Sequence, residues 1–168
     1  MAGISGGNTY KFKVRAHNMY DWGDFSNIID IVASGVPDKP PDVVVSLSNN
    51  QVKFKFDPPA TTNFASVTSY QLKIYDNSYT TSHEELTYCD ASDSDIISQL
   101  YCLVPMTTIT ASVFNIAVGS PIVAQVRAYN INGWSSFSDD NSVGINAQTV
   151  PDQITTFIEE DSDTTESQ

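Results

Sequence analysis

Apolar and polar residues alternate at every second position through much of the chain, a pattern that predicts β-strands with one buried face. Val52, Phe54 and Phe56 alternate with polar neighbours until Pro58-Pro59, which stops the strand because proline cannot donate to a β-ladder. Similar runs predict strands at 43–47, 70–75, 83–88, 96–104, 122–129 and 143–147. No segment sustains apolar residues at helical spacing. Seven short strands separated by turns predict an all-β, antiparallel two-sheet sandwich.

An internal repeat divides the chain. Residues 10–26 read YKFKVRAHNMYDWGDFS and residues 122–138 read IVAQVRAYNINGWSSFS, with seven identities in seventeen at an offset of 112. The shared residues are Val14, Arg15, Ala16, Asn18, Trp22, Phe25 and Ser26, which recur as Val126, Arg127, Ala128, Asn130, Trp134, Phe137 and Ser138. After a two-residue insertion, Val36-Pro37-Asp38 recurs as Val150-Pro151-Asp152. We therefore expect the chain to be a segment of a tandem repeat array.

The repeat predicts four segments. Residues 1–35 are the last two strands of one repeat, and residues 36–149 are one complete repeat. Residues 150–158 are a linker and the start of a next repeat, and 159–168 are an acidic, disordered tail.

Three features together resemble the fibronectin type III module. Phe56-Asp57-Pro58-Pro59 closes an early strand, Tyr70 opens the third strand, and Tyr-x-Phe-x-Val-x-Ala-x-Asn from Tyr10 to Asn18 precedes a tryptophan. The resemblance implies an immunoglobulin-like β-sandwich, with one complete module and one partial module. It also places Tyr10 at the tyrosine corner, whose hydroxyl bonds the main chain. The second repeat has Ile122 there, so this contact is expected to be missing.

The complete repeat is longer than the usual module of that family. The excess lies around residues 77–116 and contains both cysteines, Cys89 and Cys102. This elongated form is similar to repeats in large surface or secreted proteins of protists, which implies adhesion, coat or spacer roles. Such an extracellular setting favours a Cys89–Cys102 disulfide. Two buried free thiols in a reducing compartment are the alternative.

Metal binding has one weak candidate. Asp90, Asp93 and Asp95 supply the hard oxygen ligands that calcium uses, but their spacing does not match an EF-hand. A solvated loop is the simpler interpretation. The chain has too few soft ligands for a zinc site, and no cofactor is predicted.

Trp22 and Trp134 occupy equivalent positions after the penultimate strand of each repeat. The structural interpretation is that they cover the end of the core, with the phenylalanine three residues later as a partner. The functional interpretation is an exposed aromatic anchor for a protein or sugar ligand. Recurrence in both repeats favours the structural role.

Charge and motifs narrow the function. Twenty acidic against eight basic residues give a formal net charge of −12, which disfavours nucleic acid and anionic lipid partners. The sequence contains no run of about 18 apolar residues, so we do not expect direct membrane insertion. Neither a Gly-x-Ser-x-Gly turn nor a phosphate-binding glycine loop is present, so we expect no enzyme.

These observations predict a non-enzymatic structural or adhesion repeat module, acting as a spacer and protein-interaction surface in an extracellular or cell-surface protein. The expected partners are other protein domains, and the partial N-terminal repeat could self-associate through its strands. An accessory glycan- or ligand-binding module is an alternative, which a row of exposed aromatics including Tyr75 and Tyr129 would favour. An intracellular scaffold, which reduced cysteines would support, is a third alternative. The first residues carry no recognisable secretory signal.

Overall fold

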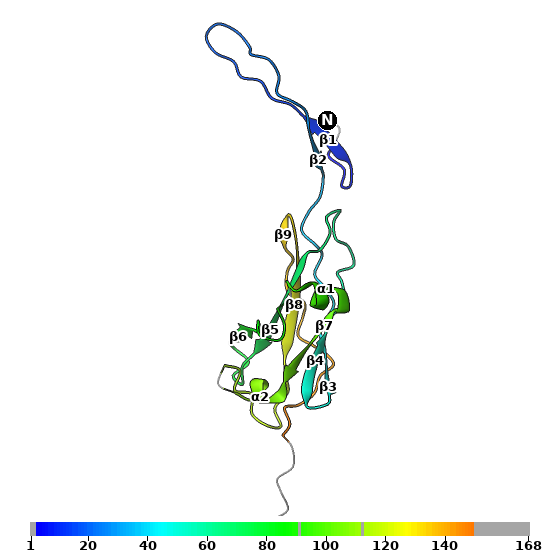
Figure 1. Ribbon diagram of the computed structural model, residues 1–168, viewed down its shortest axis with the longest axis vertical. Helices are drawn as coiled ribbons and strands as arrows, with labels where there is room; N and C mark the ends of the chain where they lie inside the picture. The colour runs from blue at the N-terminus through cyan, green and yellow to red at the C-terminus, as the bar shows by residue number, and fades with distance from the viewer. Residues whose placement is uncertain (1–2, 91, 112, 150–168) are drawn as a thin grey trace, which may run out of the picture.

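Two parts follow one another along the long axis of the computed structural model, an N-terminal hairpin and a sandwich (Figure 1). The structure describes residues 3–90, 92–111 and 113–149. The expected linker at 150–158 and acidic tail at 159–168 lie outside the described residues. None of the described helices is long and apolar enough to cross a membrane.

The sandwich consists of two antiparallel sheets, which confirms the predicted fold class. The three-stranded sheet contains, in order, β3 (Val44–Ser48), β4 (Gln51–Lys55) and β7 (Tyr101–Pro105). The four-stranded sheet contains, in order, β6 (Ser82–Glu84), β5 (Ser69–Tyr75), β8 (Ala124–Asn130) and β9 (Gly133–Trp134).

The core forms where the alternating residues of the two sheets face each other. Every second residue is buried in β4, β5 and β8, as the sequence pattern predicts. Phe54, Leu72 and Val126 are at most 1% exposed. Burial of these apolar side chains drives the two sheets together.

The predicted strand at 96–104 is wrong in its first half. Ser94–Gln99 forms a short helix, α1, because the Asp93 side chain accepts from the Asp95 amide as an N-cap. Leu100 ends the helix in the left-handed conformation, and β7 starts at the next residue. A second helix of one turn, α2 (Met106–Ile109), follows β7.

The predicted strand at 83–88 is also shorter than expected. Only Ser82–Glu84 pairs with β5. The buried Glu85 carboxylate accepts from the amides of Thr87, Tyr88 and Cys89. Because these amides bond a side chain instead of a neighbouring strand, the backbone turns here.

Cys89 and Cys102 form a disulfide. Both are buried, and Cys102 lies opposite Phe54 in the β4–β7 pair. The bond closes a 13-residue separation and ties the segment containing α1 to the core. Closing a loop of this size stabilises the folded chain by about 3 kcal/mol in the chain-entropy model.

The N-terminal hairpin pairs β1 (Thr9–Phe12) with β2 (Ile29–Val32), with Thr9 opposite Val32. The sandwich repeats this register, because Pro121 lies opposite Asn146 at the equivalent positions. The two parts of the chain therefore share one strand pairing, as the internal repeat predicts.

The two-residue insertion between the repeats changes the path of the last predicted strand, 143–147. The Asn141 side chain accepts from the Ala124 amide and donates to the Ile122 carbonyl, so it replaces the strand pairing there. Val143 pairs instead with Val44 of the other sheet. The final segment thus forms isolated bridges rather than a continuous strand.

Candidate functional site: the junction between hairpin and sandwich

The linker at 34–36 is held by asparagine side chains of the sandwich. Nδ2 of Asn130 donates to the Gly35 carbonyl at 2.8 Å. Nδ2 of Asn132 donates to the same carbonyl at 3.1 Å and to the Ser34 hydroxyl at 2.9 Å. A linker of small residues would otherwise be flexible, so these bonds restrict its conformations.

Asn63 holds the same linker from a different loop. Its carbonyl accepts from the Gly35 amide at 2.9 Å, and its Nδ2 donates to the Val36 carbonyl at 2.8 Å. Nδ2 also reaches the Asp38 carboxylate at 3.1 Å. Both backbone groups of Gly35 are therefore bonded to the sandwich.

Asn130, at the end of β8, lies at the centre of this network and is completely buried. Its Nδ2 is shared with the carbonyls of Thr62 and Ala65, and its Oδ1 accepts from the Asn132 amide at 2.9 Å. A buried amide without partners would cost about 1–3 kcal/mol, so the position requires a side chain that donates and accepts.

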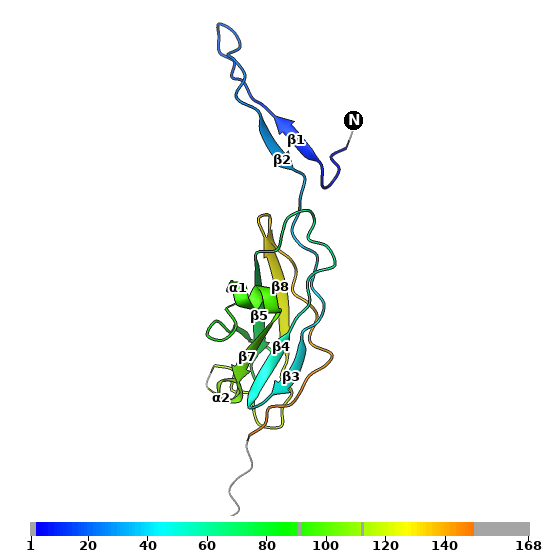
Figure 2. The ribbon, with the colours of Figure 1, turned by 45° about the vertical axis from the view of Figure 1, so that its right-hand side comes forward.

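Phe64 makes the apolar contact of the junction. Asn63 and Phe64 both have positive φ angles, 51° and 64°, which cost about 1–2 kcal/mol for each residue with a side chain. The Phe64 ring lies against Gly6 and Gly7, and a Cβ at either glycine would lie 2.7 Å from a ring carbon. A side chain at either position would therefore displace the ring from this turn. Figures 1 and 2 both show the two loops adjacent.

The turn that contains these glycines is ordered by the expected tyrosine corner. The Ser5 amide donates to Tyr10 Oη at 2.7 Å. At the equivalent position of the sandwich, Ile122 is buried and has no hydroxyl. There the Ala117 amide donates to Oδ1 of Asn77 at 3.0 Å instead. A side chain from the elongated segment thus replaces the missing tyrosine.

Trp134 lies on the outer face of the four-stranded sheet. The Arg127 guanidinium lies 4.6 Å from the ring centroids of both Trp134 and Phe137, within cation–π range. Arg127 belongs to the outward-facing residues of β8, which alternate with its buried ones. The tryptophan therefore packs on the outer face and does not cover the end of the core, contrary to the structural expectation.

The hairpin has the same arrangement. Arg15 lies 4.5 Å from the Trp22 ring and 4.7 Å from the Phe25 ring. The His17 ring contacts the Trp22 ring at a centroid distance of 4.7 Å, with the two planes tilted by 59°. Both tryptophans are thus packed against charged or aromatic neighbours, although Trp22 remains 52% exposed.

Tyr75 and Tyr129, named for a glycan site, lie on one face of the four-stranded sheet, but both are only partly exposed and cations share that face. Lys73 Nζ lies 4.1 Å from the Phe137 ring and 5.4 Å from the Tyr75 ring. The Tyr129 and Trp134 rings are in tilted contact, with their centroids 4.9 Å apart. Because rings and cations alternate, less aromatic surface is free to stack on a sugar.

The three calcium candidates do not converge. Asp90 accepts from the amide and the hydroxyl of Ser92, and these hydrogen bonds hold the pKa of its carboxyl below the usual value. Asp93 caps α1, which contains Asp95. Within residues 3–90, 92–111 and 113–149, no group of three His, Cys, Asp or Glu residues is arranged to hold a metal ion.

Comparisons with known proteins bear on the fold. No family model and no curated protein match the chain. A crystal structure of domains A168-A170 from titin matches with a TM-score of 0.59 and 18% identity, over 88% of this chain and 44% of that one. The likeness supports the immunoglobulin-like β-sandwich fold. This chain spans less than half the length of that structure.

Two further structures match more weakly. Titin kinase with its flanking domains gives a TM-score of 0.47 and 20% identity, over 67% of this chain and 18% of that chain. The twitchin kinase region from C. elegans gives a TM-score of 0.48 and 15% identity, over 67% of this chain and 17% of that one.

Replacement of Asn130 tests the junction. We expect Asn130→Ala to lower the free energy of unfolding in urea by about 1–3 kcal/mol, since three carbonyls lose a donor. The Gly35 amide should also exchange faster with solvent, because the linker is released. Asn18→Ala is the matched control, since Asn18 is the equivalent residue in the hairpin and is exposed. Equal effects of the two substitutions would contradict this role.

Proposed function

We propose that this chain is part of a tandem array of fibronectin type III-like modules in an extracellular or cell-surface protein. In this proposal it is a non-enzymatic spacer and protein-interaction surface, which contributes to adhesion. The observation that carries the proposal is the junction, where Asn63, Asn130 and Asn132 bond the linker and Phe64 packs on the preceding unit. A bonded linker fixes the direction of one unit relative to the next.

The hairpin supports an array because no described residue of the sandwich covers one of its faces. Phe12 and Val14 are 46% and 71% exposed, whereas the equivalent Ala124 and Val126 in the sandwich are completely buried. Ile29 and Ile31 are exposed on the same face of the hairpin. We infer that residues 1–35 form the last two strands of a preceding unit, whose remaining strands cover this face. In this chain alone, a second copy could cover it.

The disulfide supports an oxidising compartment, because such bonds persist in secreted and surface proteins and are rare in the cytosol. A surface cavity beside the exit at 148–149 supports a non-enzymatic role. It has a volume of about 570 Å³, and no carboxylate, imidazole or thiol lines it.

The compartment can be tested on protein isolated from its native source. We expect the intact mass to rise by two units on reduction, and alkylation before reduction to add nothing at Cys89 or Cys102. Denatured but unreduced protein is the control for simple inaccessibility. If both thiols react in the denatured, unreduced sample, the intracellular scaffold becomes the better interpretation.

The exposed face of the hairpin can be tested by sedimentation of the full chain. We expect concentration-dependent association that Ile31→Asp weakens at least about tenfold, because a charge must then be buried against apolar residues. Val32→Asp is the matched control, since Val32 is the next residue and points to the other face. A chain that stays monomeric at all concentrations would overturn this part of the proposal, as would equal effects of the two variants.

A further inference from the structure

The sandwich has a second end that matches the bound end of the hairpin. In the hairpin this end consists of the turn at 5–8 and the exit at 33–35, and the sandwich loops bind it. The equivalent surface of the sandwich is the turn at 117–120 and the exit at 147–149. We call this surface, in the hairpin and in the sandwich alike, the downstream end of the unit. We call the loops at 61–65 and 130–133 the upstream end of the sandwich.

The two downstream ends have the same backbone geometry. The Gly7 amide donates to the Ala33 carbonyl at 2.8 Å, and the Gly119 amide donates to the Ala147 carbonyl at 2.8 Å. The φ angles of the two glycines are +80° and +88°. Phe64 lies against Gly7, whereas a Cβ at Gly119 would meet no described atom within 4 Å. The downstream end of the sandwich therefore has the same backbone geometry as that of the hairpin, but no described residue packs over its glycine.

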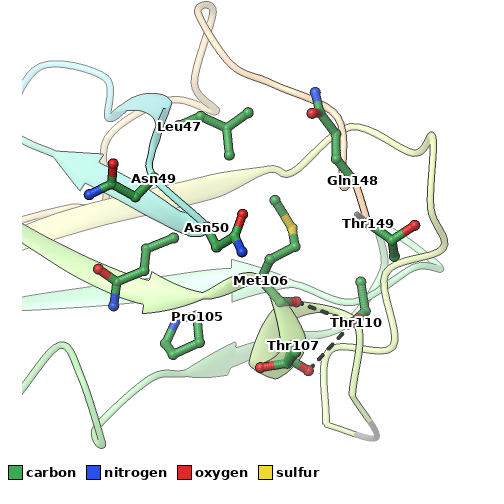
Figure 3. A pocket seen from close by; sticks show the side chains of 10 residues that line it. Leu47, Asn49, Asn50, Pro105, Met106, Thr107, Thr110, Gln148 and Thr149 are labelled. Carbon is green, nitrogen blue, oxygen red and sulfur yellow. Dashed lines mark hydrogen bonds between the residues drawn. The ribbon is translucent and has the colours of Figure 1, made fainter. Parts of the chain in front are cut away.

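A cavity next to the exit extends this surface (Figure 3). Leu47 and Met106 supply apolar side chains, and Gln148 and Thr149 complete the rim. By the repeat, Gln148 and Thr149 are the equivalents of Ser34 and Gly35, the residues that the asparagines bond at the first junction. The cavity volume is about 570 Å³, large enough for an aromatic side chain.

Charge also favours a unit of the same kind as the partner. No charged side chain lines the cavity, and Asn63, Phe64, Asn130 and Asn132 at the upstream end are also uncharged. Two copies of a chain with a net charge of −12 repel each other. A contact between two uncharged ends keeps this repulsion away from the interface.

We propose that the downstream end of the sandwich binds the upstream end of a second module of the same kind. This inference rests on the tandem array proposed above. The loop of the second module that corresponds to residues 61–65 lies over Gly119, and the asparagines that correspond to Asn130 and Asn132 bond Gln148 and Thr149. The interface is small, so it forms between units joined in one chain, where the effective concentration is high.

One position makes this second junction different from the first. Val118 stands where the hairpin has Gly6, and a Cβ at Gly6 would lie 2.7 Å from the Phe64 ring. The incoming ring therefore cannot lie flat on this turn. It shifts toward Leu47 and Met106 and enters the cavity that they line.

The test uses the full chain through Thr149 with a second copy of residues 36–149 appended directly after it. Val36 of the copy then takes the place of Val150. We expect the Thr149 amide to exchange at least about tenfold more slowly than in the parent chain, because it now bonds the copy as Gly35 bonds Asn63. Nitrogen relaxation should show the two sandwiches tumbling as one body.

Matched variants separate the two junctions. Phe64→Ala in the appended copy should abolish the protection of Thr149 and leave that of Gly35, and the same substitution in the first copy should do the reverse. Val118→Gly should increase the protection of Thr149, because the ring can then lie flat. An unprotected Thr149 beside a protected Gly35 would overturn this inference and leave the tandem array intact. If neither the Thr149 amide nor the Gly35 amide were protected, both this inference and the proposed tandem array would be overturned.

Discussion

The buried side-chain amide of Asn130 connects the strand pairing of the sandwich to the direction of the linker. It ends β8, where the sheet stops, and its Nδ2 reaches the carbonyls of Gly35 and two residues of the 61–65 loop. This donor group and the Asn63 bonds together hold the loop against the linker, and the loop in turn positions Phe64 in its unfavourable backbone conformation. Without the amide, the carbonyls would have to be hydrated, and a hydrated linker would allow many relative orientations of the two units.

The same arrangement of strands and side chains occurs twice in the chain, once in a two-stranded hairpin and once in a complete sandwich. Hairpin and sandwich share the strand register, the Arg–Trp–Phe stack on the outer face and the glycine turn at the downstream end. They differ where one interaction replaces another. Asn77 takes over the role of the tyrosine hydroxyl, and Asn141 takes the place of a strand pair. In both replacements a side-chain amide bonds a backbone group that would otherwise be unpaired, which preserves the fold while the sequence changes.

Alternation of apolar residues was sufficient to predict the sandwich, because burial of every second residue in β4, β5 and β8 is a local consequence of strand geometry. It failed at 85–99, where Glu85 and Asp93 bond nearby amides and thereby favour turns and a helix over a strand. The junction could not be found from periodicity, since its contacts join residues 25 to 98 positions apart. Its signals were present nevertheless: an asparagine that recurs in both repeats, and Gly6-Gly7 before the first strand.

The central claim is that the linker is held and that the hairpin and the sandwich share one orientation. Residual dipolar couplings of the full chain in a weakly aligning medium test it most directly. Amides of β1 and β2 should fit the same alignment tensor as those of β5 and β8. Two different tensors, with the hairpin couplings reduced toward zero, would show that the linker moves freely and would contradict the account.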